Sequence, residues 1–181
     1  MMIRQLKYFM LDYKRAMNGK AYRGLYIWLR LSIQGILAYR IERGLYSVFG
    51  NKYAIIRILI LPFLNIIYGL SNIDIDYRAD IGGGLCLFHN SLGCVINGKA
   101  IIGSNFSMVG GNAIGQKRNF EKGEYIIGTN VMMGANSVII GPVTIGNNVT
   151  IGASACVVNS FESDVTLIGV PAKVINQERS I

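Results

Sequence analysis

From residue 127 onward, aliphatic side chains recur at every sixth position of the chain. The series consists of Ile127, Met133, Ile139, Ile145, Ile151 and Val157. A helix repeats every 3.6 residues and an ordinary strand every two, so neither element alone produces a period of six. A six-residue period is typical of a left-handed parallel β-helix, in which three short strands form one triangular coil of about 18 residues. The pattern therefore predicts a β-helix whose core is a stack of these aliphatic side chains.

The same period continues upstream in two shorter series. They consist of Ile96, Ile102, Met108 and Ile114, and of Ile75, Ile81 and Leu87. The period breaks at 93–95, just after His89, and again at 115–125, which reads GQKRNFEKGEY. Insertions between coils project as loops that often line the binding face of a solenoid. We expect a β-helix over 71–168 with a loop at 115–125 and a tail over 169–181, and we expect glycines to provide the corner geometry.

The part of the chain before the repeats, 1–70, follows a different pattern. Apolar residues spaced by three and four over 23–49 predict amphipathic helices. The stretch 53–70 is an apolar run of 18 residues, interrupted by an arginine, a proline and an asparagine. Because about 20 residues are needed to span a membrane, we expect a helix buried against the coils or a neighbouring subunit. Residues 1–70 are thus predicted to be α-helical, and their beginning lacks the apolar core of a signal peptide.

Charge divides the chain at the same point. Residues 1–70 hold eleven Lys and Arg against two acidic residues, and also Trp28 and eight of the ten tyrosines. This mixture suits a helical layer on an anionic membrane surface; a solvated basic face within an oligomer is the alternative. The charges alternate with aliphatic residues instead of clustering, so nucleic acid is not an expected partner.

The cysteine content indicates the compartment. The three cysteines are odd in number and show no CxxC spacing, which favours reduced thiols over a disulfide framework. We therefore expect a cytoplasmic protein, with peripheral contact to the inner face of the cell membrane if residues 1–70 bind lipid.

Three stretches of the chain resemble a known family. They are DIDYRADIGGGLCLFH at 74–89, the late coils IGTNVMMGANSVIIGPVTIGNNVTIGASACVV, and the closing GVPAKVI. Together they resemble the serine acetyltransferase branch of the hexapeptide-repeat acyltransferases. Within that branch, the short chain and its apolar, basic N-terminal part look most like acetyltransferases of bacterial capsule and exopolysaccharide clusters. The resemblance implies acetyl transfer from acetyl-CoA by a homotrimer, with the donor bound between neighbouring subunits.

The resemblance assigns the reacting groups. It implies that His89, the only histidine, is the general base, and that Asp74 orients its imidazole. The chemistry agrees, because a hydroxyl must lose its proton as it attacks a thioester and an imidazole exchanges protons near neutral pH. A carboxylate on the other ring nitrogen would select the tautomer. Since fifteen residues is nearly one coil, Asp74 is expected to lie directly above or below His89.

The resemblance also implies where the donor binds. The family holds acetyl-CoA largely through backbone groups of the late coils, which match Gly134 with Ala135 and Gly152 with Ala153. Lys173 matches a basic position near the CoA phosphates.

The acceptor is predicted from two departures from the family. Serine acetyltransferases resembling this chain carry an acidic residue just before the catalytic histidine, and an Asp-Arg-His sequence in the loop. Here Phe88 precedes His89, and the loop offers Lys117 and Arg118 but no histidine. Because a zwitterion is distinguished by both of its charges, the expected acceptor is a carbohydrate hydroxyl in a surface polysaccharide. Phe88 would then contact the sugar ring, with packing in the core as the alternative for this residue. Lys117 or Arg118 could still meet the carboxylate of a serine.

Several alternatives stay open at this point. One is a serine O-acetyltransferase of cysteine biosynthesis, and another is a non-catalytic β-helix that acts as a scaffold or binding module. A carbonic anhydrase of the same fold needs three histidines for its metal. Cys86 and Cys94 lie near His89, but their irregular spacing is a weak metal signal, so no metal is expected.

Overall fold

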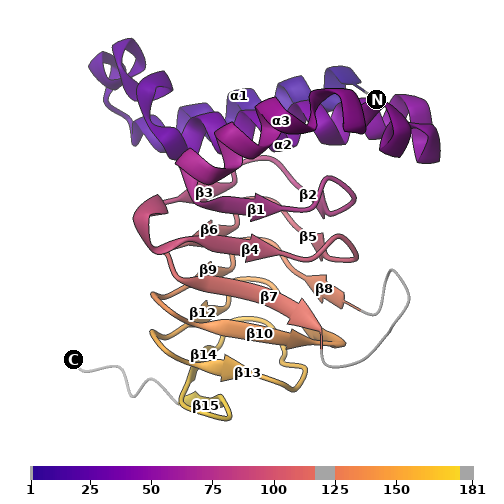
Figure 1. The fold of residues 1–181 in the computed structure, drawn as a ribbon. Coiled ribbons are helices and arrows are strands. Elements are labelled where there is room, and N and C mark those ends of the chain that lie inside the picture. The colour runs from indigo at the N-terminus through magenta and orange to yellow at the C-terminus, as the bar shows by residue number, and fades with distance from the viewer. Residues whose placement is uncertain (1, 117–124, 176–181) are drawn as a thin grey trace.

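The computed structural model describes residues 2–116 and 125–175, and it places a layer of helices across one end of a β-helix (Figure 1). The layer contains three α-helices joined by short 3-10 helices. These are α1 (Met2–Met17), η1 (Ala21–Leu25), η2 (Ile27–Leu29), α2 (Leu31–Phe49), η3 (Gly50–Lys52) and α3 (Tyr53–Ser71).

The β-helix has three parallel sheets, which we call the first, second and third sheets. The first contains β1 (Ile73–Ile75), β4 (Cys94–Ile96), β7 (Asn112–Gln116), β10 (Val138–Gly141) and β13 (Cys156–Val157). The second contains β2 (Asp80–Ile81), β5 (Ile101–Ile102), β8 (Tyr125–Ile127) and β11 (Val143–Ile145). The third contains β3 (Cys86–Leu87), β6 (Ser107–Met108), β9 (Met132–Met133), β12 (Thr150–Ile151), β14 (Thr166–Ile168) and β15 (Lys173–Ile175).

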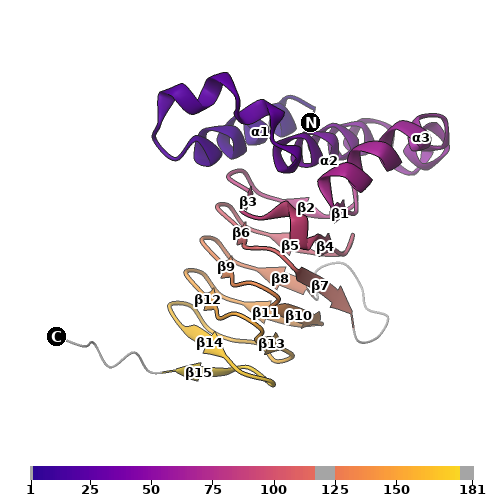
Figure 2. The ribbon, with the colours of Figure 1, turned by 60° about the vertical axis from the view of Figure 1, so that its left-hand side comes forward.

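Consecutive strands lie in different sheets, and each strand pairs in parallel with the strand one coil away (Figure 2). A parallel arrangement needs long connections between paired strands, and here the other two sides of the coil provide them. The exception is β15, which turns back and pairs with β14 in antiparallel orientation. The predicted fold class, a β-helix with an N-terminal helical region, is confirmed.

The aliphatic series forms the core of the β-helix. All six members of the series that begins at Ile127 have exposed fractions of 1% or less. Pairing places them in three stacks; in the first sheet, for example, Ile114 lies beside Ile139, which in turn lies beside Val157. Each stack therefore buries one aliphatic side chain per coil and side, as the six-residue period predicted.

The corners use glycine, as predicted, and asparagine, which was not predicted. Positive φ angles in the β-helix occur at glycines such as Gly84 and Gly111, and also at asparagines: Asn105, Asn130, Asn136 and Asn148. Asparagine tolerates this conformation better than other non-glycine residues, and here its amides also bond between coils, with Asn130 Nδ2 donating to Asn148 Oδ1 over 3.1 Å. The repeat glycines instead allow close stacking. A Cβ on Gly128 would lie 2.5 Å from the carbonyl oxygen of Gly146 in the next coil.

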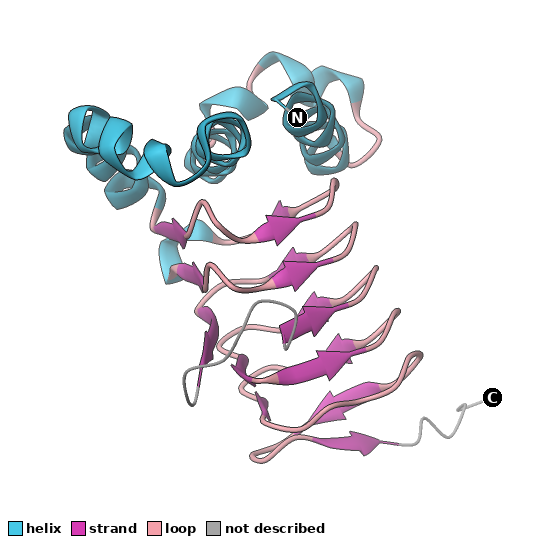
Figure 3. Ribbon diagram, turned by 90° about the vertical axis from the view of Figure 1, so that its right-hand side faces the viewer, coloured by secondary structure: helices cyan, strands magenta, loops and turns pink. Residues whose placement is uncertain are grey.

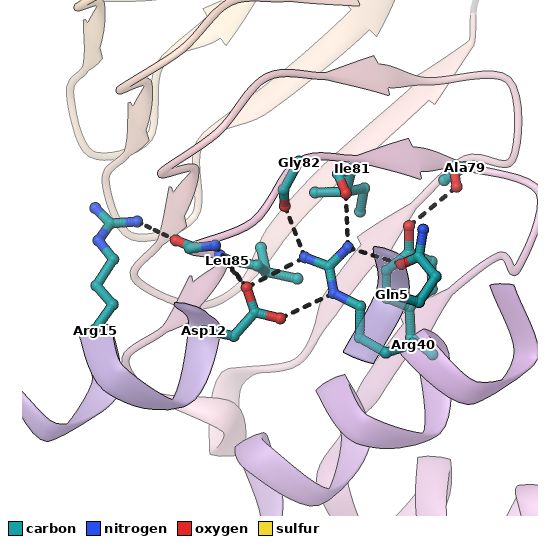
Figure 4. Close-up of polar contacts among 10 residues, drawn as sticks. Gln5, Asp12, Arg15, Arg40, Ala79, Ile81, Gly82 and Leu85 are labelled. Atoms are coloured by element: carbon teal, nitrogen blue, oxygen red, sulfur yellow. Dashed lines mark hydrogen bonds and ion pairs between the residues drawn. The ribbon is translucent and has the colours of Figure 1, made fainter. Parts of the chain in front are cut away.

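The helical layer covers the open end of the β-helix, as Figure 3 shows with the helices above the first coil. Backbone groups of a terminal coil have no earlier coil to pair with, and burying them unpaired is costly. Arg40 of α2, which is 1% exposed, donates to the carbonyl oxygens of Ile81 and Gly82 over 2.6 and 2.7 Å (Figure 4). Its guanidinium also pairs with Asp12 of α1 over 2.8 Å.

Asp12 and Arg15 complete this cap from α1. The Asp12 carboxylate accepts the backbone N–H groups of Gly84 and Leu85, each over 2.7 Å, and Arg15 donates to the carbonyl oxygen of Gly84 (Figure 4). Burial raises the pKa of Asp12, and Arg40 together with the two N–H groups opposes that shift. The cap therefore satisfies both donors and acceptors of the first coil with one buried ion pair.

Helix α3 packs on α2 through a second polar cluster. Glu42 accepts hydrogen bonds from the Tyr53 hydroxyl over 2.8 Å, from Arg57 over 2.6 Å and from the Tyr68 hydroxyl over 2.5 Å.

The outward face of α3 is apolar and exposed, and it comprises Ile55, Ile58, Leu59, Phe63, Ile66 and Leu70. One helical stretch, Leu31–Ser71, is long and apolar enough to cross a membrane by length and composition. The sequence predicted that this helix is buried against the coils or against a neighbouring subunit. The coils of this chain do not bury α3, so the first of these two expectations is wrong.

Candidate active site

His89 lies at a corner of the first coil, between β3 of the third sheet and β4 of the first sheet. This coil is longer than a standard one, because Ile73 pairs with Cys94, whereas in a later coil Val138 pairs with Cys156. The additional residues form the short helix η4 (Asn90–Leu92). The side chain of His89 is exposed, because the enlarged corner carries it outside the packed core.

The backbone beneath His89 is tightly held. The His89 N–H donates to the carbonyl oxygen of Val109 over 2.9 Å. A Cβ on Gly110 would lie 2.5 Å from the His89 carbonyl oxygen, and Gly110 has a φ of +144° that other residues rarely adopt. The buried amide of Asn112 accepts the Gly110 N–H over 2.8 Å and donates to the carbonyl oxygen of Gly134 over 2.7 Å. His89 is therefore mounted on a rigid corner, which is what a precisely placed base requires.

The predicted donor residues lie at the equivalent corner of later coils. Gly134 and Ala135 follow β9, and Gly152 and Ala153 follow β12, so both pairs join the third sheet to the first, as His89 does. The pairs stack on each other: Gly134 N–H donates to the carbonyl oxygen of Ile151 over 2.7 Å, and a Cβ on Gly134 would lie 2.7 Å from the Ala153 nitrogen. The corner that holds His89 therefore continues as an edge of small residues.

Lys173 lies near the end of this edge. It is exposed on β15 and pairs with Ile168 of β14. Ile168 in turn contacts the corner, since a Cβ on Gly152 would lie 2.9 Å from its Cγ2 atom. The structure thus brings His89 and all five predicted donor residues to one side of the molecule.

The expected stacking of Asp74 on His89 is wrong. In the first sheet Asp74 pairs with Val95, six residues beyond His89. This offset of six residues follows from the parallel register of the first sheet. The long first coil places His89 at a corner, whereas Asp74 lies within a strand. Among the described residues, neither side chain forms a hydrogen bond or ion pair. Asp74 instead lines a groove of about 630 Å³ between α3 and the first sheet, together with Leu92 and Gly93 from the corner of His89.

A separate cavity of about 300 Å³ lies between the helical layer and β3. We call it the arginine cavity, because its lining includes Arg15, Arg23 and Arg30, with Ser32, Cys86 and Phe88. Arg30 donates to the Phe88 carbonyl oxygen over 3.2 Å. Burial raises the pKa of the Cys86 thiol, so this cysteine stays protonated near neutral pH and is a poor nucleophile.

The other two predicted acceptor residues are not described. Lys117 and Arg118 lie outside the described residues, between the end of β7 at Gln116 and the start of β8 at Tyr125.

Sequence reasoning missed the arginine cavity. The basic residues of 1–70 were interpreted as a surface layer, but three of them converge from α1, η1 and the residue before α2. No spacing rule connects these positions, because their proximity depends on how the helices pack on the first coil. Sequence reasoning also missed the structural role of the buried amide of Asn112. The sequence indicated it only by placing a polar residue within the repeat.

Comparison with known proteins identifies relatives of this chain. Residues 124–159 match the family model described as bacterial transferase hexapeptide (six repeats). A chloroplastic serine acetyltransferase of Arabidopsis thaliana is 34% identical over 152 residues, which is 83% of this chain and 47% of the relative. The crystal structure of a serine acetyltransferase from Neisseria gonorrhoeae superposes with a TM-score of 0.80 at 30% identity, over 99% of this chain and 67% of that one. The structure of the same enzyme in complex with serine superposes with a TM-score of 0.79 at 29% identity, over 96% of this chain and 70% of that one.

These relatives overturn the expected acceptor. They are serine acetyltransferases, so the prediction of a carbohydrate hydroxyl in a surface polysaccharide is wrong, and these relatives favour the serine alternative. The structure supplies a physical reason. Phe88 does not form an isolated apolar platform for a sugar ring; it belongs to the wall of a cavity rich in guanidinium groups. The chain spans about half the length of the curated relatives it matches.

Proposed function

Because this chain belongs to the hexapeptide-repeat transferase family as a homologue of serine acetyltransferases, we propose that it transfers the acetyl group of acetyl-CoA to the hydroxyl of L-serine. One observation carries the proposal. His89, the only histidine, stands exposed on the same corner of the β-helix as the stacked small residues that match the donor site.

The proposed reaction uses His89 as a general base. Its imidazole takes the proton of the serine hydroxyl as the oxygen attacks the thioester carbonyl carbon, so a C–O bond forms while the C–S bond breaks. The same imidazolium then returns the proton to the departing CoA sulfur. The products are O-acetyl-L-serine and free CoA, and the neutral imidazole is regenerated for the next turnover.

The small-residue edge provides the proposed path for the donor. Without side chains beyond Cβ, Gly134, Ala135, Gly152 and Ala153 allow a long, flexible ligand to approach the backbone closely. Lys173 supplies a positive charge at the far end of this edge, where it would attract the CoA phosphates. For Asp74 we propose a positioning role that requires the His89 side chain to turn toward the groove beneath α3.

We expect direct turnover of L-serine. Purified protein with acetyl-CoA and L-serine should release free thiol with a kcat on the order of 10 s⁻¹, typical of enzymes, and mass spectrometry should detect O-acetyl-L-serine. Acetyl-CoA without acceptor provides the control for hydrolysis. A rate of CoA release that L-serine does not raise above this hydrolysis would contradict the proposed function.

We also propose that the active form is a homotrimer. The outward face of α3 is a continuous apolar surface that this chain leaves uncovered, and large exposed apolar patches commonly mark interfaces. Light scattering in non-denaturing buffer should give a mass of about 60 kDa, three times the 19.9 kDa chain. The double variant Ile58→Glu/Phe63→Glu should shift the mass toward the monomer. An active wild-type protein with a monomeric mass would refute this.

A further inference from the structure

The arginine cavity contains more positive charge than its surroundings neutralise. Three guanidinium groups, those of Arg15, Arg23 and Arg30, line about 300 Å³ of space. No acidic residue is among the described residues that line it. The nearest carboxylate named in the cap, that of Asp12, is already bonded to Arg40 and to two backbone N–H groups. Clustered like charges repel one another, so such a cavity favours an anionic ligand.

Much of the hydrogen-bonding capacity in the cavity is unused. Each guanidinium has five N–H donors. The Nε atom of Arg23 is buried and has no hydrogen-bond partner in the described structure, and unpaired buried donors are costly. Within the described residues, the Arg30 guanidinium makes one hydrogen bond, to the Phe88 carbonyl oxygen. Arg15 is different, because it is already bonded to the carbonyl oxygens of Gly84 and Phe106 and to the Ser107 hydroxyl.

The N-terminus of α2 also favours an anionic ligand in the cavity. Ser32 and Ile33, in the first turn of this 19-residue helix, also line the cavity. No side chain caps the helix, and its first turn contains no acidic residue. The backbone N–H groups at a helix start carry partial positive charge and bind anions. The helix end therefore adds to the arginines an independent preference for negative charge.

We propose that the arginine cavity binds the carboxylate of the acceptor, with Arg23 and Arg30 as the specificity-determining residues. This inference rests on the proposed function and extends it to the substrate class. Phe88 lines the cavity and His89 is the next residue in the chain, so a carboxylate held in the cavity lies beside the corner that carries the proposed base. An arginine fork matches a carboxylate with two parallel hydrogen bonds.

The cavity also predicts what is not recognised. No carboxylate among the described lining residues is available to pair with an ammonium group. The acceptor class is therefore the small β-hydroxy carboxylates, for which the negative charge is required and the amine is dispensable. L-Glycerate, with a hydroxyl in place of the ammonium, should be acetylated with a kcat/KM within about tenfold of that for L-serine. L-Serinamide, which lacks the negative charge, should lose at least tenfold.

The test measures kinetics and binding on separate variants. Arg23→Gln and Arg30→Gln should each raise the KM for L-serine by roughly 10- to 100-fold, the size expected for a hydrogen bond to a charged group. Neither should change the KM for acetyl-CoA, and Arg23→Lys should recover part of the loss. Lys7→Gln and Lys52→Gln remove the same charge from exposed positions outside the cavity, so they should leave the KM for L-serine unchanged.

A second readout separates this inference from the proposed function. Inorganic phosphate, as a probe anion, should bind the wild-type chain in calorimetry and bind at least tenfold more weakly to Arg23→Gln and Arg30→Gln. If L-serine is not acetylated but phosphate binding depends on these arginines, the proposed function fails and the anion site stands. If L-serine is acetylated with an unchanged KM in both variants, the site assignment fails alone. If neither transfer nor arginine-dependent binding occurs, both fail.

Discussion

Replacing His89 with alanine is expected to lower kcat for acetyl transfer by about 10²- to 10⁴-fold, the usual contribution of a general base. The folded chain should be unaffected. The His89 side chain is exposed, and in the described parts of the structure it makes no hydrogen bond or ion pair. Thermal unfolding followed by circular dichroism should therefore give an unchanged Tm, and acetyl-CoA should bind with its original affinity, because the small-residue edge is untouched.

Two further variants serve as comparisons for the expected loss of activity in His89→Ala. Ser91→Ala removes an exposed hydroxyl from η4, two residues away, and should leave kcat within about twofold. Asp74→Asn should reduce kcat less than His89→Ala, since a positioning carboxylate acts only through the imidazole. An Asp74 effect should also appear as a changed pH profile of kcat/KM, which a merely structural effect would not produce. Activity within a few-fold of wild type in His89→Ala would exclude His89 as the base.

Replacing Arg40 with methionine is expected to destabilise the chain by about 3–5 kcal/mol, the cost of removing one partner from a buried ion pair. Arg40 and Asp12 have side chains that are 1% and 0% exposed. Without the guanidinium, the Asp12 carboxylate loses its counter-ion and two carbonyl oxygens of the first coil lose their donors. For a chain of this size, Tm should fall by roughly 6–20 °C.

The control for this prediction is a surface ion pair on the same layer. Arg4 and Asp80 approach to 3.8 Å with side chains that are 51% and 36% exposed. Arg4→Gln should change stability by at most about 1 kcal/mol. Adding Asp12→Asn to Arg40→Met should recover part of the loss, because the amide oxygen still accepts the two N–H groups without a buried charge. Equal destabilisation by Arg4→Gln and Arg40→Met would show that the buried pair does not hold the cap.

The stacking of the small residues proposed to hold the donor was predictable, because in a repeat the position in the sequence fixes the position in the coil. Once the period of six is recognised, residues 134 and 152 are equivalent, and a family motif located in one coil transfers directly to the other. The same logic failed for Asp74. The additional residues at the corner of His89 change the offset between coils, so a separation of nearly one standard coil no longer corresponds to vertical stacking.

The acceptor was mispredicted for a related reason. Phe88 was judged as a single residue that replaces an acidic one, and its aromatic ring suggested a sugar. Its environment comes from residues more than fifty positions away, such as Arg30, which bonds to its carbonyl oxygen. The net charge of a cavity depends on all the residues that line it, whereas a sequence motif contains only those that are neighbours along the chain.

By itself, the sequence determined the three-sided β-helix, the helical nature of the N-terminal part over 1–70 and the single histidine as the candidate base. These follow from local periodicity and from residue types, which act at a fixed spacing along the chain. Only the tertiary structure decided how Arg40 and Asp12 close the first coil, which residues provide the corners, and how three arginines meet beside Phe88. Those contacts join elements that lie far apart in the sequence, as Arg15 and Phe106 do, and their geometry depends on the docking of helices onto backbone groups, for which the sequence carries no periodic signal.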